Sequence, residues 1–600
     1  MRVAALLGFA VLLNACGGSG GSTPTPPSPS TSPTAPTIAS PCTAALAALP
    51  GAPAVTAASS RAKQHGGLGH DKRNPRELLL EHRAALAEGR VRAEDVRAAA
   101  TATDVGDVIV IQDDGSLISS PNPFDLSGQG VRFSPNASGG YDVSRIDAAF
   151  RANLGARITL ADDDTLATAI PFTFPFYGRG YTGAFVNSDG NITFGAGDVA
   201  TDERGLARLL SGAPRVAPHF ADLDPSAGGG VFLAAGPEAL TVTWCAVHGF
   251  DAPSTTTTQA SLLPDGSVEV KFASVTYGIG IVALSPGATQ NFTPVDLRAA
   301  GPTAGGAGAV GERFASEAAL DLVATGRAFY QGHSDSYDQL VVWTDTGVVT
   351  SDTFAYETTV SNSIQGIGTE IVDLSRELGS GGRLGSLVVM DTLSKYPSDP
   401  AARVVGENNT LALLGHESGH RWLATLRFRE ASGTLSDALL GRQLAHWSFF
   451  FDSDASFVEG NDIQDLGGGS FRTAGAVSGY GPLDLYAMGL IDASEVPPFF
   501  FVEAPTGASQ DRESAPRTGV TFSGRRHDLT VADIVAALGP RVPPASGAPR
   551  LHRQAFVYVV GRGRTMDQAA IDKVERFRTA WEPFFAAATG GRMAVDTQLR

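Results

Sequence analysis

One short pattern constrains this chain more than any other. His416, Glu417 and His420 form an H-E-x-x-H within LALLGHESGHRWLATLRF, residues 411–428. The apolar positions of that stretch have helical spacing, and the polar residues at 408–410 can cap a helix that starts there. Histidines four residues apart lie one turn apart on the same face of a helix. The pattern therefore predicts a largely buried helix that carries two imidazoles on one face.

The spacing of these side chains suits a metal ion. Two imidazole nitrogens one turn apart can bind one tetrahedral zinc ion at about 2.0–2.1 Å each. Glu417 is then placed to act on a water molecule at the metal and not on the metal itself. The alternative is a buried amphipathic helix whose histidines are satisfied by hydrogen bonds. We favour the metal site, because two buried histidines are costly without a partner.

The H-E-x-x-H motif resembles that of the zincin metallopeptidases. The resemblance implies that His416 and His420 bind zinc, that Glu417 serves as general base and proton shuttle, and that the substrates are proteins or peptides. The longer metzincin form, with a glycine and a third histidine, is missing, because Leu423 and Leu426 occupy those positions. A third ligand must come from further along the chain.

We expect His446 to be the third ligand, because it follows His420 by a comfortable return distance and imidazole is a common zinc ligand. The alternative for His446 is packing with Trp447 in the core. Glu459 is the second candidate and would give a site of two histidines and a glutamate, as in gluzincins. Three further carboxylates follow His446, of which the first two are expected to face solvent or fix a turn: Asp452, Asp454 and Asp484.

A tyrosine-rich segment follows these candidates. Tyr480 or Tyr486 could donate a hydrogen bond to a tetrahedral oxyanion, although tyrosines that flank a helix usually pack. Met488 precedes a glycine and could lie under the metal, as the Met-turn of metzincins does, or belong to the core. His527 and His552 stand apart from these motifs and are expected at the surface.

The N-terminus has the pattern of a targeting segment. Arg2 precedes a short apolar run that is too short to span a bilayer, and Cys16 follows a small residue. The segment resembles a bacterial lipoprotein signal, which implies a signal peptide at residues 1–15 and lipidation of Cys16. An ordinary signal peptide is the alternative. Residues 16–40 are rich in Gly, Ser, Pro and Thr and are expected to form a tether.

Residues 166–300 contain short β-branched and aromatic runs separated by Gly-containing turns, which predict a β-sandwich-like module. FPFYG at 174–178, NSDG at 187–190 and the Asp222 and Asp224 region resemble the extracellular domain found in nidogen. The two aspartates could touch calcium, but a polar turn is favoured because two carboxylates are too few for a calcium site. His219 is expected to be structural.

The remaining sequence is divided by composition and pattern. Residues 41–104 are predicted to be a helical N-terminal segment and possible propeptide, residues 105–165 a small β-rich module, and residues 312–600 an α/β (α+β) zincin-like domain. The fold class is therefore multidomain. Cys42 and Cys245 could form one disulfide in an oxidising compartment, or remain unpaired.

These features together predict a zinc-dependent endopeptidase that acts outside the cytoplasm. The lipid anchor implies attachment to a membrane of the cell envelope, with the outer membrane favoured because Gly17, not an acidic residue, follows the cysteine. A net charge of −17 argues against nucleic acid as a partner. The alternative is a surface adhesin or matrix-binding lipoprotein with a structural or vestigial metal site. Hydrolysis of a non-peptide amide is a third possibility.

Overall fold

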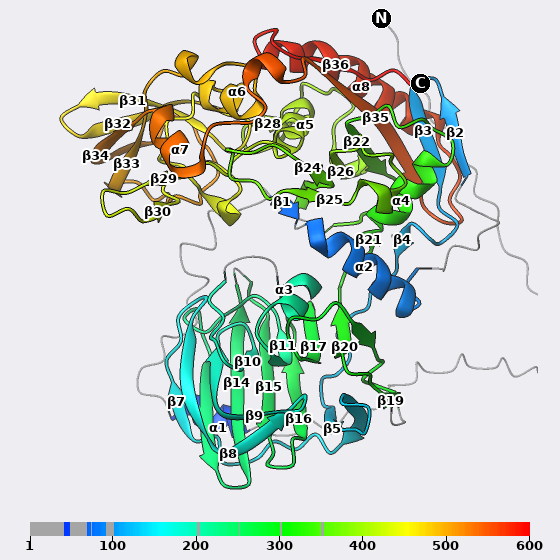
Figure 1. The fold of residues 1–600 in the computed structure, drawn as a ribbon, viewed down its shortest axis with the longest axis vertical. Helices are drawn as coiled ribbons and strands as arrows, with labels where there is room; N and C mark the ends of the chain where they lie inside the picture. The colour runs from blue at the N-terminus through cyan, green and yellow to red at the C-terminus, as the bar shows by residue number, and fades with distance from the viewer. Residues whose placement is uncertain are drawn as a thin grey trace, which may run out of the picture. The chain divides into compact units, whose positions relative to one another are not determined.

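The computed structural model describes residues 41–48, 69–73, 75–91, 101–200, 204–250, 252–299, 303–349 and 353–600. The predicted signal peptide, the predicted lipidation site at Cys16 and the predicted tether therefore lie outside the described residues. Most of the described chain is organised around several β-sheets (Figure 1). Among the helices of this part of the chain, none is long and apolar enough to cross a bilayer.

A β-sandwich-like body contains two sheets that share one core. The core side chains come from both sheets and include Phe133, Val186, Trp244 and Val282. The first sheet has the order β19-β6-β5-β16-β15-β14-β13-β7, with β12 paired to β14, and the second has the order β18-β20-β17-β11-β10-β9-β8. The strands of the two sheets are β5 (Gly130–Pro135), β6 (Tyr141–Ile146), β7 (Ala156–Ile158), β8 (Thr165–Phe176), β9 (Arg179–Asn187), β10 (Asn191–Thr193), β11 (Arg215–Phe220), β12 (Leu223–Asp224), β13 (Gly230–Gly236), β14 (Ala239–Gly249), β15 (Thr255–Leu262), β16 (Val268–Val275), β17 (Gly280–Ser285), β18 (Phe292–Pro294), β19 (Thr303–Ala304) and β20 (Ala309–Phe314).

The second body is built on a mixed eight-stranded sheet. Its order is β1-β23-β26-β22-β35-β3-β2, with β36 paired to β35. The central strands β26, β22, β35 and β3 are parallel, and β23 and β2 run antiparallel to their inner neighbours. The strands are β1 (Gly69–Arg73), β2 (Thr101–Val105), β3 (Val108–Gln112), β22 (Gln339–Thr344), β23 (Thr353–Thr359), β26 (Ser386–Thr392), β35 (Leu551–Val560) and β36 (Ala594–Asp596).

Helices cover both faces of this sheet, as its nearly continuous apolar strands require. Successive side chains of β22 point to opposite faces: Val341 and Trp343 join the core that contains α5 (Thr410–Gly419) and α8 (Gln568–Ala588). Leu340 and Val342 join the core that contains α4 (Leu322–Tyr330). Helix α5 is therefore packed between one face of the sheet and the chain segments that follow the helix.

The remaining elements are shorter. A four-stranded sheet has the order β31-β32-β34-β33, and four two-stranded ribbons pair β4 with β21, β24 with β25, β27 with β28 and β29 with β30. The bounds are α1 (Pro41–Ala47), α2 (Pro75–Ala87), α3 (Leu206–Ser211), α6 (Pro482–Met488), α7 (Val531–Leu538), β4 (Ile118–Ser119), β21 (Ala319–Leu320), β24 (Ser361–Asn362), β25 (Val372–Asp373), β27 (Arg403–Val405), β28 (Asn408–Asn409), β29 (Phe428–Arg429), β30 (Leu435–Ser436), β31 (Asn461–Gly467), β32 (Ser470–Ala476), β33 (Phe499–Thr506) and β34 (Thr521–Leu529).

Two predicted segments are divided differently in the structure. The stretch 105–165 is not a module of its own: β3 joins the eight-stranded sheet, whereas β5, β6 and β7 join the sandwich. Residues 41–104 are not only helical, because β1 and β2 pair within the same eight-stranded sheet. The sequence does not show that β1 and β3 enter this sheet, because their partners β23 and β35 lie hundreds of residues away along the chain.

Cys42 and Cys245 form a disulfide that spans 203 residues. It joins α1 to β14 and lies in a small apolar cluster with Leu154 and Phe232. The alternative that the sequence left open is thus decided in favour of pairing. The bond ties the start of the described chain to the sandwich.

We expect replacement of both cysteines by serine to lower the free energy of unfolding of the sandwich by about 2–5 kcal/mol, because a long loop is no longer closed in the unfolded chain. Urea unfolding of the oxidised protein and of the Cys42→Ser/Cys245→Ser variant measures the difference. Peptide mapping without reductant should recover the two cysteines in one cross-linked peptide. Two free thiols in the folded oxidised protein would contradict the pairing.

Candidate metal centre

Helix α5 begins with a side-chain cap and is buried along its whole length. The Asn409 side chain accepts a hydrogen bond from the Ala412 N–H at 2.8 Å, as an N-cap residue does. The helix ends at Gly419 and His420 is its C-cap, so the helical stretch is shorter than the predicted 411–428. Leu423 and Leu426 are nevertheless buried, because the chain after the helix folds back into the same core.

Two glycines allow α5 to lie close to its neighbours. A Cβ atom added at Gly415 would lie 2.7 Å from the ring of Phe457, and one at Gly419 would lie 3.1 Å from the ring of Tyr480. The Tyr480 hydroxyl donates to the Gly415 carbonyl oxygen at 2.6 Å. Close approach of this kind brings residue 457 within reach of the first histidine.

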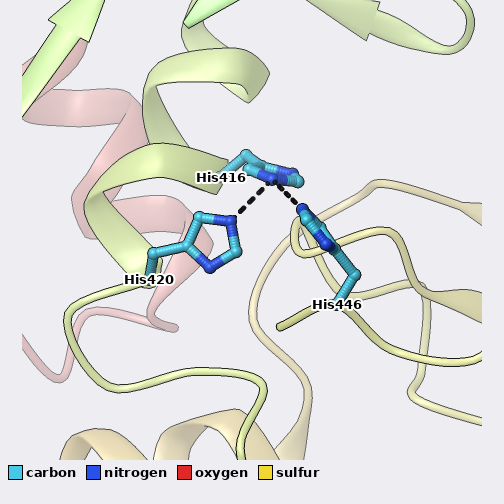
Figure 2. A group of neighbouring side chains, drawn as sticks. All are labelled: His416, His420 and His446. Carbon is cyan, nitrogen blue, oxygen red and sulfur yellow. Dashed lines mark hydrogen bonds between the residues drawn. The ribbon is translucent and has the colours of Figure 1, made fainter. Parts of the chain in front are cut away.

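Three buried imidazoles converge beside α5 (Figure 2). His416 and His420 come from the helix, and His446 comes from the loop that follows it. The His416 Nε2 atom lies 3.0 Å from His420 Nε2 and 3.2 Å from His446 Nε2. Each of the three residues is at most 1% exposed. In the part of the chain that the structure describes, they form the one group of three or more His, Cys, Asp or Glu side chains close enough to hold a metal ion.

Backbone carbonyls fix the tautomers of two of these rings. His416 Nδ1 lies 2.9 Å from the Phe457 carbonyl oxygen, and His446 Nδ1 lies 2.8 Å from the Arg442 carbonyl oxygen. A carbonyl oxygen only accepts, so each Nδ1 carries the proton. In the neutral rings both Nε2 atoms then present lone pairs, and they face each other across 3.2 Å. A metal ion that both lone pairs bind would stabilise this arrangement.

A proton is a poor substitute for that cation at neutral pH. Burial lowers the pKa of His416 to about 4, and the nearby Arg442 charge lowers it too, although Glu459 opposes both effects. The spacing suits a metal, because nitrogens at about 2.0–2.1 Å from a tetrahedral zinc ion lie about 3.3–3.4 Å apart. The donor set and its geometry therefore fit zinc.

Glu417 lies in the same helix but is not one of the three converging groups. Its carboxylate is fully buried, and its charge contributes, after burial and Asp391, to a pKa of Tyr396 well above the usual range. The Tyr396 hydroxyl donates to the Phe354 carbonyl oxygen of β23 at 2.8 Å. Glu417 thus follows His416 directly in the buried helix, and its charge acts on Tyr396.

Glu459, the second candidate for third ligand, does not join the group. Its carboxylate pairs with Arg442: Oε1 lies 2.8 Å from Nη2 and Oε2 lies 3.4 Å from Nε. The same Nη2 atom lies 3.1 Å from His446 Nε2. Arg442 was not among the residues predicted for this site, although it lies only four residues before His446.

The other downstream carboxylates have structural partners. Asp484 accepts from the Trp447 indole N–H at 2.9 Å and from the Gly481 N–H at 3.0 Å, and burial raises its pKa to about 6 against those hydrogen bonds. Asp452 accepts from the Ile463 N–H at 2.9 Å, and Asp454 is exposed. Neither belongs to the group of histidines.

Tyr480, Tyr486 and Met488 take the packing positions that the sequence left open as alternatives. The proton of Tyr480 is committed to the Gly415 carbonyl oxygen. Tyr486 accepts from the Arg541 N–H at 3.4 Å. Met488 is a buried core residue whose carbonyl oxygen accepts from the Arg541 guanidinium at the end of α6.

A buried polar network anchors α5 to the sheet. Ser418 Oγ accepts from Gln554 Nε2 at 3.3 Å, and Gln554 in turn donates to Gln339 Oε1. Gln339 donates to Ser386 Oγ at 2.7 Å, while the Trp581 indole N–H of α8 donates to Gln554 Oε1 at 2.6 Å. The network connects α5 with β35, β22, β26 and α8 and thereby fixes the helix that carries His416 and His420.

The remaining histidines stay outside the centre. His552 is buried against Trp422, and burial lowers its pKa to about 4, so its predicted surface position is wrong. His527 is half-buried and contacts Glu503. His219 is structural, as predicted: it is fully buried and its Nδ1 lies 2.9 Å from Thr256 Oγ1.

The two aspartates of the sandwich also have local partners. Asp222 forms an ion pair with Arg204 at 3.0 Å. Asp224 accepts from the Ser226 N–H at 2.8 Å, which is the geometry of a polar turn. Within the described residues, neither belongs to a group that could hold a metal ion.

Comparison with known proteins identifies part of the sandwich. A family model described as NIDO related matches residues 140–304. The match confirms the nidogen-like character predicted for residues 166–300 and extends it toward the N-terminus, where β6 joins the same sheet. No match was found among curated proteins or among solved structures.

We expect Gly415→Ala to lower the free energy of unfolding by up to about 2 kcal/mol, because overpacking against Phe457 costs about 1–3 kcal/mol and the higher helix propensity of alanine offsets about 1 kcal/mol of that. The metal content should fall as well, since the shift separates His416 from the Phe457 carbonyl oxygen. Gly332→Ala is the matched control, because a Cβ atom there meets nothing within 4 Å. Urea unfolding and elemental analysis give the two values; equal behaviour of both variants would contradict the close packing of α5.

Proposed function

We propose that the chain is a zinc-dependent endopeptidase that acts on proteins or peptides outside the cytoplasm. The observation that carries the proposal is the pair of Nε2 lone pairs of His416 and His446, held 3.2 Å apart by hydrogen bonds at the opposite ring nitrogens. With His420 they supply three neutral imidazoles, a ligand set that catalytic zinc uses with a fourth position left open.

Zinc, when bound, would supply Lewis-acid polarisation of the substrate carbonyl and would acidify a water molecule. His416, His420 and His446 would hold the ion, and their Nδ1 hydrogen bonds would keep the lone pairs directed at it. Glu417 takes a proton from the attacking water and returns it to the leaving amine. Burial of Glu417 supports this role, because a desolvated carboxylate is a stronger base.

The location remains part of the proposal. Cys16 would be the lipidated residue, and the lipid would hold the protein at an envelope membrane, with residues 16–40 as tether. The disulfide between Cys42 and Cys245 supports an oxidising compartment. The nidogen-like module at 140–304 would bind or space other molecules.

A second candidate is a surface adhesin in which that module provides the function and the metal site is structural or vestigial. The family match to residues 140–304 is the observation in its favour. A structural zinc site is normally closed by four protein ligands and needs no general base. Three histidines with Glu417 beside them favour the enzyme.

We expect about one zinc ion per chain in the protein that lacks residues 1–40, and loss of that zinc in His446→Ala. His527→Ala is the matched control, since it removes a half-buried imidazole outside the centre. Elemental analysis after gel filtration measures both. If His446→Ala retained zinc, Glu459 would again be the candidate for the third ligand. If the folded parent protein contained no zinc, the peptidase proposal would fail and the adhesin would be the remaining candidate.

Glu417→Gln should retain zinc and lose about 10²–10⁴-fold in kcat, because the amide cannot carry the proton. Cleavage of fluorescently labelled casein by the zinc-loaded proteins measures the loss. The variant keeps the volume of the side chain, so its unfolding midpoint should stay close to that of the parent. Equal cleavage by both proteins would exclude Glu417 as the base.

A further inference from the structure

The segment that supplies His446 also brings a guanidinium to the edge of the centre. Arg442 Nη2 lies 3.1 Å from His446 Nε2, the atom that lies 3.2 Å from His416 Nε2. Figure 2 shows the imidazole of His446 directed from its loop toward the two histidines of the helix. The Arg442 guanidinium therefore borders the nitrogen through which His446 would bind a metal.

The backbone of this segment is strained in a way that produces the approach. Gln443 and Leu444 have φ values of 56° and 51°, in the left-handed region that non-glycine residues rarely adopt. Two consecutive residues of this kind cost energy and persist because the surroundings hold them. The turn lets the Arg442 carbonyl oxygen accept from His446 Nδ1 while the Arg442 side chain reaches His446 Nε2.

Glu459 holds the guanidinium in place and balances its charge. The carboxylate contacts Nη2 at 2.8 Å and Nε at 3.4 Å, a two-point arrangement that fixes the plane of the guanidinium. The two side chains are 13% and 3% exposed. Because the Arg442–Glu459 pair carries no net charge, the guanidinium can lie near a bound metal ion at a smaller electrostatic cost.

Metal loading would redirect one donor of this guanidinium. The N–H that faces His446 Nε2 loses its acceptor once a metal ion takes that lone pair. That N–H would then be directed to another acceptor at the same place, such as the carbonyl oxygen of a bound substrate. Tyr480, which was predicted as a possible donor to an oxyanion, already donates its hydroxyl hydrogen bond to the Gly415 carbonyl oxygen.

We propose that Arg442, held by Glu459, is the oxyanion-binding residue of the centre. This inference rests on the proposed zinc chemistry and adds to it the group that stabilises the negative charge formed on the substrate carbonyl oxygen. A preorganised cationic donor in a dry site is worth much more than the same group in water. Glu459 is a positioning residue in this scheme and acts through Arg442.

The test uses the protein loaded with Co²⁺, whose visible absorption reports an anion that enters the metal's coordination sphere, and acetohydroxamate as the probe. We expect Arg442→Met to retain one metal ion per chain and to weaken acetohydroxamate binding about 10–100-fold. Arg442→Lys should recover part of the loss, and Glu459→Gln should weaken binding less than Arg442→Met does. Arg512→Met is the control, because it removes a guanidinium whose printed side-chain partners are Asp437 and Glu513 and not a histidine.

Kinetics on the zinc-loaded proteins supply a second measure. Loss of Arg442 should lower kcat about 10²–10³-fold and change KM little, since the interaction forms in the transition state. Unchanged acetohydroxamate affinity in metal-loaded Arg442→Met would overturn the inference while leaving the zinc centre intact. Loss of the metal itself in Arg442→Met would assign the residue a structural role and also overturn the inference.

The parent protein separates this inference from the proposed function. A parent that binds no metal would refute both. A parent that binds metal and acetohydroxamate through Arg442 but cleaves nothing would refute the peptidase alone.

Discussion

The hydrogen bonds from His416 Nδ1 and His446 Nδ1 to backbone carbonyl oxygens are the interactions on which the rest of the centre depends. They determine that in each ring Nδ1 is the hydrogen-bond donor and Nε2 carries the lone pair. A side-chain partner could rotate away or change its protonation state, but a carbonyl oxygen fixed in the backbone can do neither. The ligand character of the centre is therefore set by the fold around Phe457 and Arg442.

That fold depends in turn on the packing of α5. Gly415 and Gly419 let the helix approach residues 457 and 480, and the network through Ser418, Gln554 and Trp581 attaches it to the sheet and to α8. The glycines allow the short distance between α5 and residues 457 and 480. The hydrogen-bond network through Ser418 fixes how the helix is oriented on the sheet. Together they hold His416 and His420 toward the loop from which His446 comes.

The sequence was sufficient where the information is local. The H-E-x-x-H spacing predicted the helix, its cap region and the shared face of two histidines, and turn-rich β patterns predicted the sandwich that the NIDO-related match covers in large part. The sequence was insufficient where distant segments meet. Nothing near residue 108 shows that it pairs with residue 556, and nothing in the sequence around Glu459 shows that its charge is taken by Arg442.

In the proposed peptidase, the burial of the centre also determines which part of the chain would have to move for a substrate to bind. His416, Glu417, His420 and His446 are all at most 1% exposed, which suits a metal ion and a water molecule but leaves no surface for an extended peptide. The loop that carries Arg442 has exposed and strained residues, as does the segment 454–459 that supplies Glu459, whereas α5 is buried along its whole length. Opening on the side of this loop would therefore admit the substrate while two of the three imidazoles keep their positions, and closure would return the guanidinium to the metal together with the third.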